Sequence, residues 1–213
     1  MAIPSLLRLA EHEALKNVTL NGKVLDLGAD ANSNYLSFVQ GTFEVTRVNL
    51  DTKTKPDILH DLEKPLPIPD ASYDAVVLFN VLEHIFEYRA LLDEAVRVLK
   101  PKGTMLVVVP FLFPIHPSPD DFHRFTASAL QKEFDRLGFI SSTIRPLGTG
   151  VYSAHYLFID RLMPRPVRFI AFHTIRHIVR LLDTALAQSA RVLGKQYDPA
   201  HYALGYCATA QKA

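Results

Sequence analysis

The chain has 213 residues, of which 48% are hydrophobic and 21% charged, as expected of a single globular domain, spanning 1–213, with a sizeable core. Its net charge at pH 7 is only +1, so the chain lacks the excess of basic residues typical of nucleic-acid-binding proteins, and we expect no nucleic-acid partner. The single cysteine, Cys207, excludes an internal disulfide framework and favours a reducing, cytoplasmic setting.

Charge is unevenly distributed along the chain. Residues 1–160 contain 15 Lys and Arg against 20 Asp and Glu, whereas residues 161–213 contain 8 against 2. This asymmetry indicates that the C-terminal part meets an anionic partner or surface. The alternative is that its basic face packs on the acidic remainder of the chain.

Apolar patterning gives no sign of a membrane span or a signal peptide. The longest apolar run, residues 105–115, is about half as long as a bilayer requires. Arg8, Glu11 and Glu13 interrupt the N-terminal apolar residues, as they would not in a signal peptide. We therefore expect a cytoplasmic protein.

The first elements read as a helix, a strand, a short helix and a second strand. Apolar side chains recur at helical spacing over residues 3–16. Residues 23–28 (KVLDLG) predict a buried strand that ends at Gly28, where the backbone turns sharply or approaches another group. Residues 34–40 predict a short helix, and residues 43–50 a strand that leads into Asp51.

Asp51 follows Gly28 by 23 positions, close to the spacing of about 20 residues for an acid that holds ribose hydroxyls. The alternative is a structural role, because Asp51 also begins an Asp-x-Lys-Thr turn. A dinucleotide site needs Gly-x-Gly-x-x-Gly, and only Gly28 is present here, so a nicotinamide-linked oxidoreductase is disfavoured.

The most informative stretch is 57–84, DILHDLEKPLPIPDASYDAVVLFNVLEH. A short strand ends at Asp61, whose carboxylate can accept a hydrogen bond from a ligand's amine. Residues 65–69 contain too much proline for a helix or a central strand. Residues 75–79 form an apolar run typical of a parallel strand buried on both faces, and residues 80–84 place polar groups at its carboxyl end.

Further along, residues 86–99 predict an amphipathic helix, followed by a buried strand and by a loop rich in Pro, His and Asp at 111–126. Thr126 is expected to cap the next helix, which Gly138 ends. Residues 139–147 and 202–211 predict the last two strands. The alternation of strands and helices predicts a doubly wound α/β fold.

A helical insertion at about 152–199 precedes the last strand. Its main helix is expected at 167–193, with most of its apolar residues on one half and most of its basic residues on the other. A helix of this kind lies on an anionic membrane surface or, more commonly, covers a core or a partner chain. We therefore predict docking or dimerisation through this helix, or a location peripheral to a membrane.

The co-occurrence of HDLEKPLPIPDASYDAVV with VLEHI resembles the class I S-adenosylmethionine (SAM) methyltransferases, in particular the small type 11 group. RVLKPKGTMLVVVP is similar to that family's LKPGG turn and fifth strand. The resemblance covers residues 22–148, more weakly 202–212, and implies a Rossmann-like methyltransferase fold. Its sheet would be seven-stranded and mostly parallel, with an antiparallel last strand.

The resemblance also implies where SAM binds. Asp61 would lie near the adenine amine, and Asp51 would hold the ribose. The expected cofactor-binding residues are Asp26, Gly28, Ala29, Asp51, Asp61, Leu62 and Asn80. Asp30 and Asn32 replace two glycines of the family's Asp/Glu-x-Gly-x-Gly-x-Gly motif. This departure motivates the alternative function, a non-catalytic binding or scaffold protein on the same fold.

Methyl transfer to a small-molecule, sugar or lipid-linked acceptor, most readily through oxygen, is the function that the resemblance implies. An oxygen nucleophile needs help in losing its proton, and histidine suits that role near neutral pH. The candidates are His84, His116 and His123, each with a structural role as the alternative. The loop 111–124 is expected to meet the acceptor.

Two further patterns in this loop are interpreted as structural. Arg124 is expected to pair with Asp120 or Asp121, and the alternative is that it anchors an acidic group of the acceptor. The spacing of His116, Asp120, Asp121 and His123 matches no zinc-ligand pattern, so we expect no metal there.

Overall fold

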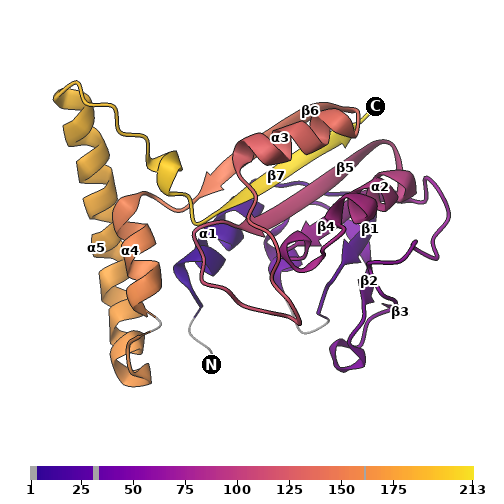
Figure 1. Cartoon of the computed structure of the whole chain (residues 1–213), viewed down its shortest axis with the longest axis horizontal. Coiled ribbons are helices and arrows are strands. Elements are labelled where there is room, and N and C mark those ends of the chain that lie inside the picture. Colours follow the sequence, from indigo (N-terminus) through magenta and orange to yellow (C-terminus); the bar gives the residue numbers. More distant parts are fainter. Residues whose placement is uncertain (1–3, 31–33, 161) are drawn as a thin grey trace.

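The computed structural model describes residues 4–30, 34–160 and 162–213. A seven-stranded sheet in the order β3-β2-β1-β4-β5-β7-β6 forms its centre (Figure 1). The strands are β1 (Gly22–Leu27), β2 (Phe43–Asn49), β3 (Ile58–Leu59), β4 (Tyr73–Phe79), β5 (Leu99–Pro110), β6 (Phe139–Leu147) and β7 (Gly205–Lys212). β1 to β5 pair in parallel, and β7 runs antiparallel to β5 and β6. The predicted sheet and its antiparallel last strand are confirmed.

Helices and single turns connect these strands. The α-helices are α1 (Leu6–Leu15), α2 (Tyr88–Val98), α3 (Ala127–Arg136), α4 (Val151–Asp160) and α5 (Arg165–Val192). The 3-10 turns are η1 (Tyr35–Phe38), η2 (Thr52–Thr54), η3 (Leu82–His84) and η4 (Pro199–Tyr202). The short helix predicted at 34–40 is thus only a 3-10 turn, because Val39 is already extended and Gly41 follows with φ +107°.

Both faces of the sheet are covered. Alternate residues of β4 point to opposite faces, and all five residues of 75–79 are buried. Val76 and Leu78 join a core shared with α2 and α3. Ala75, Val77 and Phe79 join a second core shared with α1, η1 and α4. The continuous apolar run is therefore explained by two helical layers, as predicted for a parallel strand.

The predicted start and end of α3 are confirmed. The Thr126 side chain accepts a hydrogen bond from Ala129 N at 3.2 Å and starts α3. Gly138 follows α3 with φ +75°, the left-handed conformation that glycine adopts without strain. The proline-rich loop is held against α2, where Arg97 donates to the carbonyl oxygens of Leu66 and Ile68.

The insertion forms a pair of helices, α4 and α5, that stands apart from most of the sheet (Figure 1). Asp183 of α5 is fully buried and accepts hydrogen bonds from the Tyr152 and Ser153 backbone N–H groups in the first turn of α4. Its carboxylate also accepts from the hydroxyls of Thr149 and Ser153. The buried Asp183, which lies among the apolar residues of α5, therefore joins the two helices.

Through its bonds to α4, Asp183 determines which side of α5 faces inward. This side differs from the apolar half that the sequence predicted. The face turned inward contains Ala171, Val179, Asp183 and Ala190. Four residues expected on the apolar half are instead exposed: Val167, Ile178, Leu182 and Ala185. From the predicted basic half, Arg176, His177 and Arg180 line a cavity of about 550 Å³ between α1, the end of β6 and α5.

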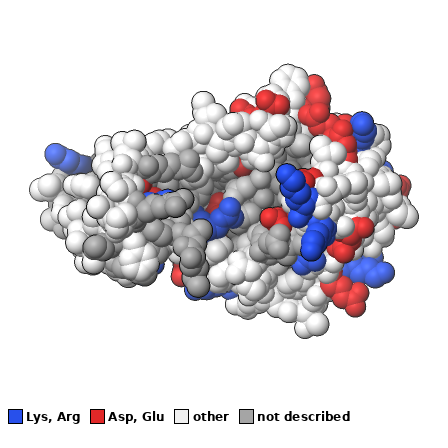
Figure 2. Space-filling model, turned by 90° about the horizontal axis from the view of Figure 1, so that it is seen from below, with Lys and Arg blue, Asp and Glu red and all other residues white. Residues whose placement is uncertain are grey.

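One face of the molecule shows an uneven distribution of charge. Seen from below, charged side chains of both signs gather at the end that contains the sheet, whereas the described residues at the α4 and α5 end show mainly uncharged surface (Figure 2). No helix in the described part of the chain is both long and apolar enough to cross a bilayer.

Candidate functional site

The candidate site lies where the parallel strands end. In this sheet order, the carboxyl ends of β3, β2, β1, β4 and β5 follow one another along one edge. The segments that leave these ends contain Asp61, Asp51, Gly28, Asn80 and the loop 111–126. Ligands of open α/β sheets bind outside this edge.

Gly28 provides a close approach between β1 and β4. Its φ is +81°, and a Cβ atom at this position would lie 2.3 Å from Cγ2 of Val81. Any other residue would therefore be strained and would also clash with the segment after β4. The predicted need for a glycine at the end of this strand is confirmed.

Asn49, which the sequence analysis did not select, holds the loop after β1. Its Nδ2 donates to the carbonyl oxygens of Gly28 and Ala29 at 3.1 and 2.9 Å, and its Oδ1 accepts from Asp51 N at 2.9 Å. One side chain thus ties the ends of β1 and β2 together. The available signal was a polar residue directly after the buried Val48.

The predicted acids at this edge differ in environment. Asp51 begins η2 and accepts from Lys53 N at 2.8 Å, so its turn-forming role is present. Asp61 accepts from Glu63 N at 3.1 Å, and the neighbouring Leu62 is buried. In each aspartate, Oδ1 therefore accepts a hydrogen bond within its own turn.

Asp26 lies deeper than the other acids. It is 1% exposed, and its Oδ2 accepts a hydrogen bond from the Tyr35 hydroxyl. Its Oδ1 has no hydrogen-bond partner among the residues described. Burial raises the pKa of Asp26 to about 7. The Tyr35 ring stacks on Phe79 at 4.0 Å, which fixes the hydroxyl that holds Asp26.

Asn80 connects the end of β4 to α1. It adopts φ +52°, and its Nδ2 donates to Oε1 of Glu11 at 2.9 Å. Glu11 is 1% exposed, and burial raises the pKa of its carboxyl group. The sequence analysis missed Glu11, although it follows the buried Leu7 by four positions and so shares its helix face.

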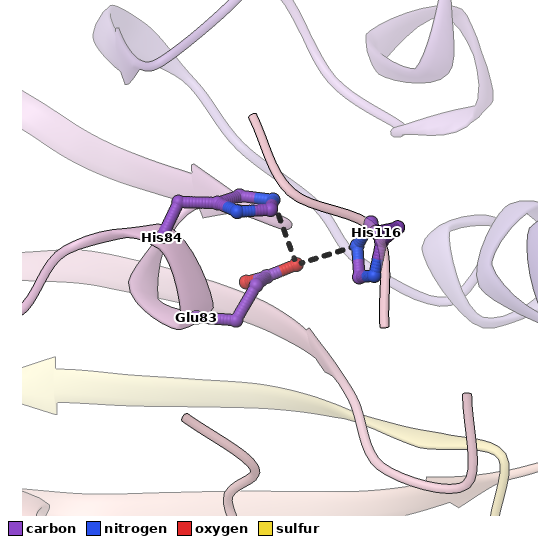
Figure 3. A group of neighbouring side chains, drawn as sticks. All are labelled: Glu83, His84 and His116. Atoms are coloured by element: carbon purple, nitrogen blue, oxygen red, sulfur yellow. Dashed lines mark ion pairs between the residues drawn. The ribbon is translucent and has the colours of Figure 1, made fainter. Parts of the chain in front are cut away.

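Glu83, His84 and His116 lie side by side at the ends of β4 and β5 (Figure 3). Oε1 of Glu83 is 3.8 Å from Nε2 of His84 and 3.7 Å from Nε2 of His116. The nearby Glu83 carboxylate raises the pKa of the His116 imidazole. The structure thus brings together two of the three predicted histidines around an acid that the sequence analysis did not select.

The third histidine has a different environment. The ring of His123 packs between Phe86, Tyr88 and Phe125, and its Nε2 donates to the Phe86 carbonyl oxygen at 3.1 Å. Its backbone N–H donates to the Glu83 carbonyl oxygen at 3.2 Å. These contacts give His123 a bracing role between the loop 111–126 and η3.

The loop 111–126 is fixed by an ion pair. Arg124 donates to both carboxylate oxygens of Asp121, with 2.7 Å between Nη2 and Oδ2, and Asp121 also accepts from His116 N at 2.9 Å. Arg124 holds the pKa of Asp121 below its usual range. The predicted pairing of Arg124 with one of the two aspartates is confirmed, and it positions His116.

Residues 25–107 match the model of a family described as a methyltransferase domain. A probable S-adenosylmethionine-dependent methyltransferase of Mycolicibacterium smegmatis is 37% identical over 89 residues, covering 39% of this chain and 35% of that protein. A demethylmenaquinone methyltransferase of Clavibacter sepedonicus is 37% identical over 70 residues, covering 33% of this chain and 29% of that protein. The chain thus spans about a third of the length of these curated relatives.

Solved structures with a similar fold cover nearly the whole chain. A SAM-dependent methyltransferase from Archaeoglobus fulgidus has a TM-score of 0.56 at 15% identity, covering 97% of this chain and 92% of that one. The cyclase SpnF has a TM-score of 0.58 at 19% identity, covering 96% of this chain and 80% of that one. At such identities the likeness shows the fold, and a fold alone does not fix the chemistry.

Proposed function

We propose that the chain carries a class I, SAM-dependent methyltransferase domain of the type 11 family and that it transfers the methyl group of SAM to an acceptor oxygen. The proposed acceptor is a small molecule, a sugar or a lipid-linked intermediate. The cofactor supplies an activated methyl group and its leaving group, and the protein supplies alignment. The methyl carbon–sulfur bond breaks as the carbon–oxygen bond forms, and the acceptor's hydroxyl proton leaves to a base.

The observation that carries this proposal is the arrangement of three residues at neighbouring strand ends. Gly28, Asp51 and Asp61 follow β1, β2 and β3, which are adjacent in the sheet. At the Gly28 turn, Val81 packs where a Cβ atom would lie, so the segments that leave β1 and β4 meet closely at this edge. We assign Asp51 to the ribose hydroxyls and Asp61 to the adenine amine, with Ala29 and Leu62 beside them.

The charge of this edge supports a cationic cofactor. Glu11, Asp26 and Glu83 are all buried near the carboxyl ends of β1 and β4. Ionised carboxylates attract a sulfonium and repel a pyrophosphate. Arg8 lies 3.1 Å from Glu11 and burial raises the pKa of Asp26 to about 7, so Glu83 and the exposed acids of the loops contribute most of this charge. This distribution favours SAM over a dinucleotide, in agreement with the absence of a Gly-x-Gly-x-x-Gly motif from the sequence.

For the acceptor we assign the loop 111–126 as one wall of the pocket and His84 or His116 as the base. In both histidines Nδ1 faces a backbone carbonyl oxygen, so Nε2 is the nitrogen left to accept a proton. His123 is disfavoured as a base because its Nε2 already donates to Phe86.

We also propose that α5 is an interaction surface. The predicted membrane or docking contact gains support from exposed apolar side chains along it, namely Val167, Phe169, Ile178, Leu181, Leu182 and Val192. All except Phe169 fall on one side of the helix at about 100° per residue, and an exposed apolar surface of this kind is typical of contact with a partner or a membrane.

A non-catalytic role on the same fold is the competing proposal. It rests on Asp30 and Asn32, which replace two family glycines, and Asn32 lies outside the described residues. The two proposals differ in one measurable property, because a scaffold protein would not need to bind SAM.

Substitution of the two edge acids tests the assigned SAM site. We expect Asp51→Ala and Asp61→Ala each to weaken SAM binding by about tenfold or more, the equivalent of about 1.4 kcal/mol for one lost hydrogen bond to ligand. Isothermal titration calorimetry of the folded variants measures this.

Asp198→Ala is the matched control. Asp198 caps η4 and accepts from Ala200 N at 2.9 Å, much as Asp51 caps η2 and accepts from Lys53 N. Its loss should leave SAM affinity unchanged. Unchanged affinity in both edge variants would contradict the site assignment.

A further inference from the structure

Glu83, His84 and His116 form a three-residue group that the sequence spacing did not indicate. The sequence analysis considered His116 together with residues 120–123, whereas the fold places it against the end of β4. The nearest carboxylate oxygen and one ring nitrogen from each histidine all lie within 4.8 Å of one another. The carboxylate lies between the two imidazole rings (Figure 3).

Backbone carbonyl groups fix the tautomer of both histidines. Nδ1 of His84 lies 2.6 Å from the Asp120 carbonyl oxygen, and Nδ1 of His116 lies 3.1 Å from that of Pro114. A carbonyl oxygen only accepts, so each Nδ1 carries a hydrogen and each neutral ring presents the Nε2 lone pair. Both lone pairs are on the side of the Glu83 carboxylate.

Glu83 has two histidines at ion-pair distance, but its carboxylate accepts no hydrogen bond from the residues described. It is 0% exposed, and neither of its carboxylate oxygens has a hydrogen-bond partner within residues 4–30, 34–160 and 162–213. A buried carboxylate is costly unless it is paired, hydrogen-bonded or bound to a metal. Without a cation, the Glu83 carboxylate favours a proton on His116. When both rings are neutral, two Nε2 lone pairs and a carboxylate oxygen converge with no hydrogen between them, and a cation can take the place of that proton.

We propose that Glu83, His84 and His116 bind a divalent first-row transition metal such as Zn²⁺. Two neutral imidazoles and one carboxylate are a donor set that these metals accept, whereas Mg²⁺ and Ca²⁺ prefer oxygen ligands. Ligands at 2.0–2.1 Å from a tetrahedral zinc are about 3.3 Å apart. The two distances to Glu83, 3.7 and 3.8 Å, need to shorten by only a few tenths of an ångström.

The surroundings of the group also suit a metal. Nδ1 of His116 lies 3.2 Å from Oδ2 of Asp121, and this contact from a carboxylate to the distal ring nitrogen orients a metal-binding histidine. The side chains of His84 and His116 are 13% and 28% exposed, so the site opens to solvent on the histidine side. A cation there retains a coordination position for a water or a ligand.

Such a metal would give the site a defined chemical role, which rests on the proposed function. A hydroxyl group bound to a divalent metal has a lowered pKa, so an acceptor alcohol or phenol could lose its proton to solvent near neutral pH. The two histidines would then hold the cation and need not act as bases. The proposed acceptors are then alcohols or phenols whose oxygen can bind the metal.

Metal binding can be measured without SAM and without an acceptor. Protein freed of metal by chelation is titrated with Zn²⁺ in a calorimeter, and we expect one high-affinity site per chain. Glu83→Gln, His84→Ala and His116→Ala should each weaken that site by about 100-fold or more. Glu83→Gln keeps the shape of the side chain, and circular dichroism checks that each variant is folded.

His201→Ala is the control for adventitious binding, because the His201 side chain is 79% exposed on η4. It should retain the high-affinity site. Saturating Zn²⁺ should raise the melting temperature of the natural protein and of His201→Ala, but not that of Glu83→Gln. Equal Zn²⁺ affinity in the natural protein and the three site variants would overturn the proposal. A chain that binds Zn²⁺ but not SAM would overturn the proposed function and leave the metal site standing.

Discussion

The buried carboxyl group of Asp26 makes the stability of the fold depend on pH. It lies on the central strand β1, bonded to Tyr35 through one oxygen, and its pKa is raised to about 7 by burial. An acid with a raised pKa in the folded state keeps its proton there at a pH where the unfolded chain has lost it. Its stabilising contribution is therefore present at low pH and is lost as the pH rises through 7.

Asp26→Asn tests this directly. In the natural protein the free energy of unfolding should fall between pH 4 and pH 7 by up to about 1.4 kcal/mol per pH unit, or about 4 kcal/mol in all. Asparagine keeps an acceptor for Tyr35 and cannot ionise, so the variant should lose this slope and exceed the natural protein in stability at pH 8.

Urea unfolding at several pH values measures the difference between the two proteins. Asp135→Asn, at an exposed position on α3, is the control and should keep the natural slope. A variant whose slope equals that of the natural protein would show that Asp26 is not the group that titrates.

At the scale of elements, patterns that depend on local neighbours were predictable and those that depend on distant partners were not. The apolar run of β4 and the Thr126 cap of α3 are determined by adjacent residues, and both are confirmed. The inward face of α5 was predicted wrongly, because it depends on the bond from Asp183 to α4, about 30 residues earlier. No periodicity of apolar residues contains that information.

The contact between α4 and α5 gives a prediction at this scale. Asp183→Ala removes the acceptor for two first-turn N–H groups and two hydroxyls, and should destabilise the helix pair by about 3 kcal/mol or more. Asp183→Asn keeps one acceptor oxygen and should cost less.

Hydrogen exchange of the amides in α4 is the appropriate measurement, because the helix pair can open without the sheet. Protection in α4 should fall in the order natural protein, Asp183→Asn, Asp183→Ala. The β4 amides serve as an internal control. Equal protection of α4 in all three proteins would contradict the anchoring role of Asp183.

At the scale of the whole molecule, the sheet topology assembles the candidate site. Gly28, Asp51 and Asp61 were predicted from motifs and lie at neighbouring strand ends. Asn49, Glu11 and Glu83 were missed, because their roles arise only when α1, β1, β2 and β4 are packed together. Glu83 and His116 are more than thirty positions apart, and their approach depends on the parallel pairing of β4 with β5.

The folded structure also shows where the basic residues of the C-terminal part lie. The C-terminal excess of basic residues suggested an anionic partner for α5. In the structure, Arg176, His177 and Arg180 line a cavity against α1, and exposed apolar side chains of α5 accompany its exposed basic ones. The contact that we propose for α5 therefore combines apolar and basic side chains.

Calorimetric titration of the purified protein with SAM and with S-adenosylhomocysteine tests the central claim most directly. We predict that both bind with micromolar affinity at the one site proposed beside Gly28, Asp51 and Asp61, despite Asp30 and Asn32. No binding of either compound up to millimolar concentration would contradict a methyltransferase function and favour a non-catalytic protein that acts through α5.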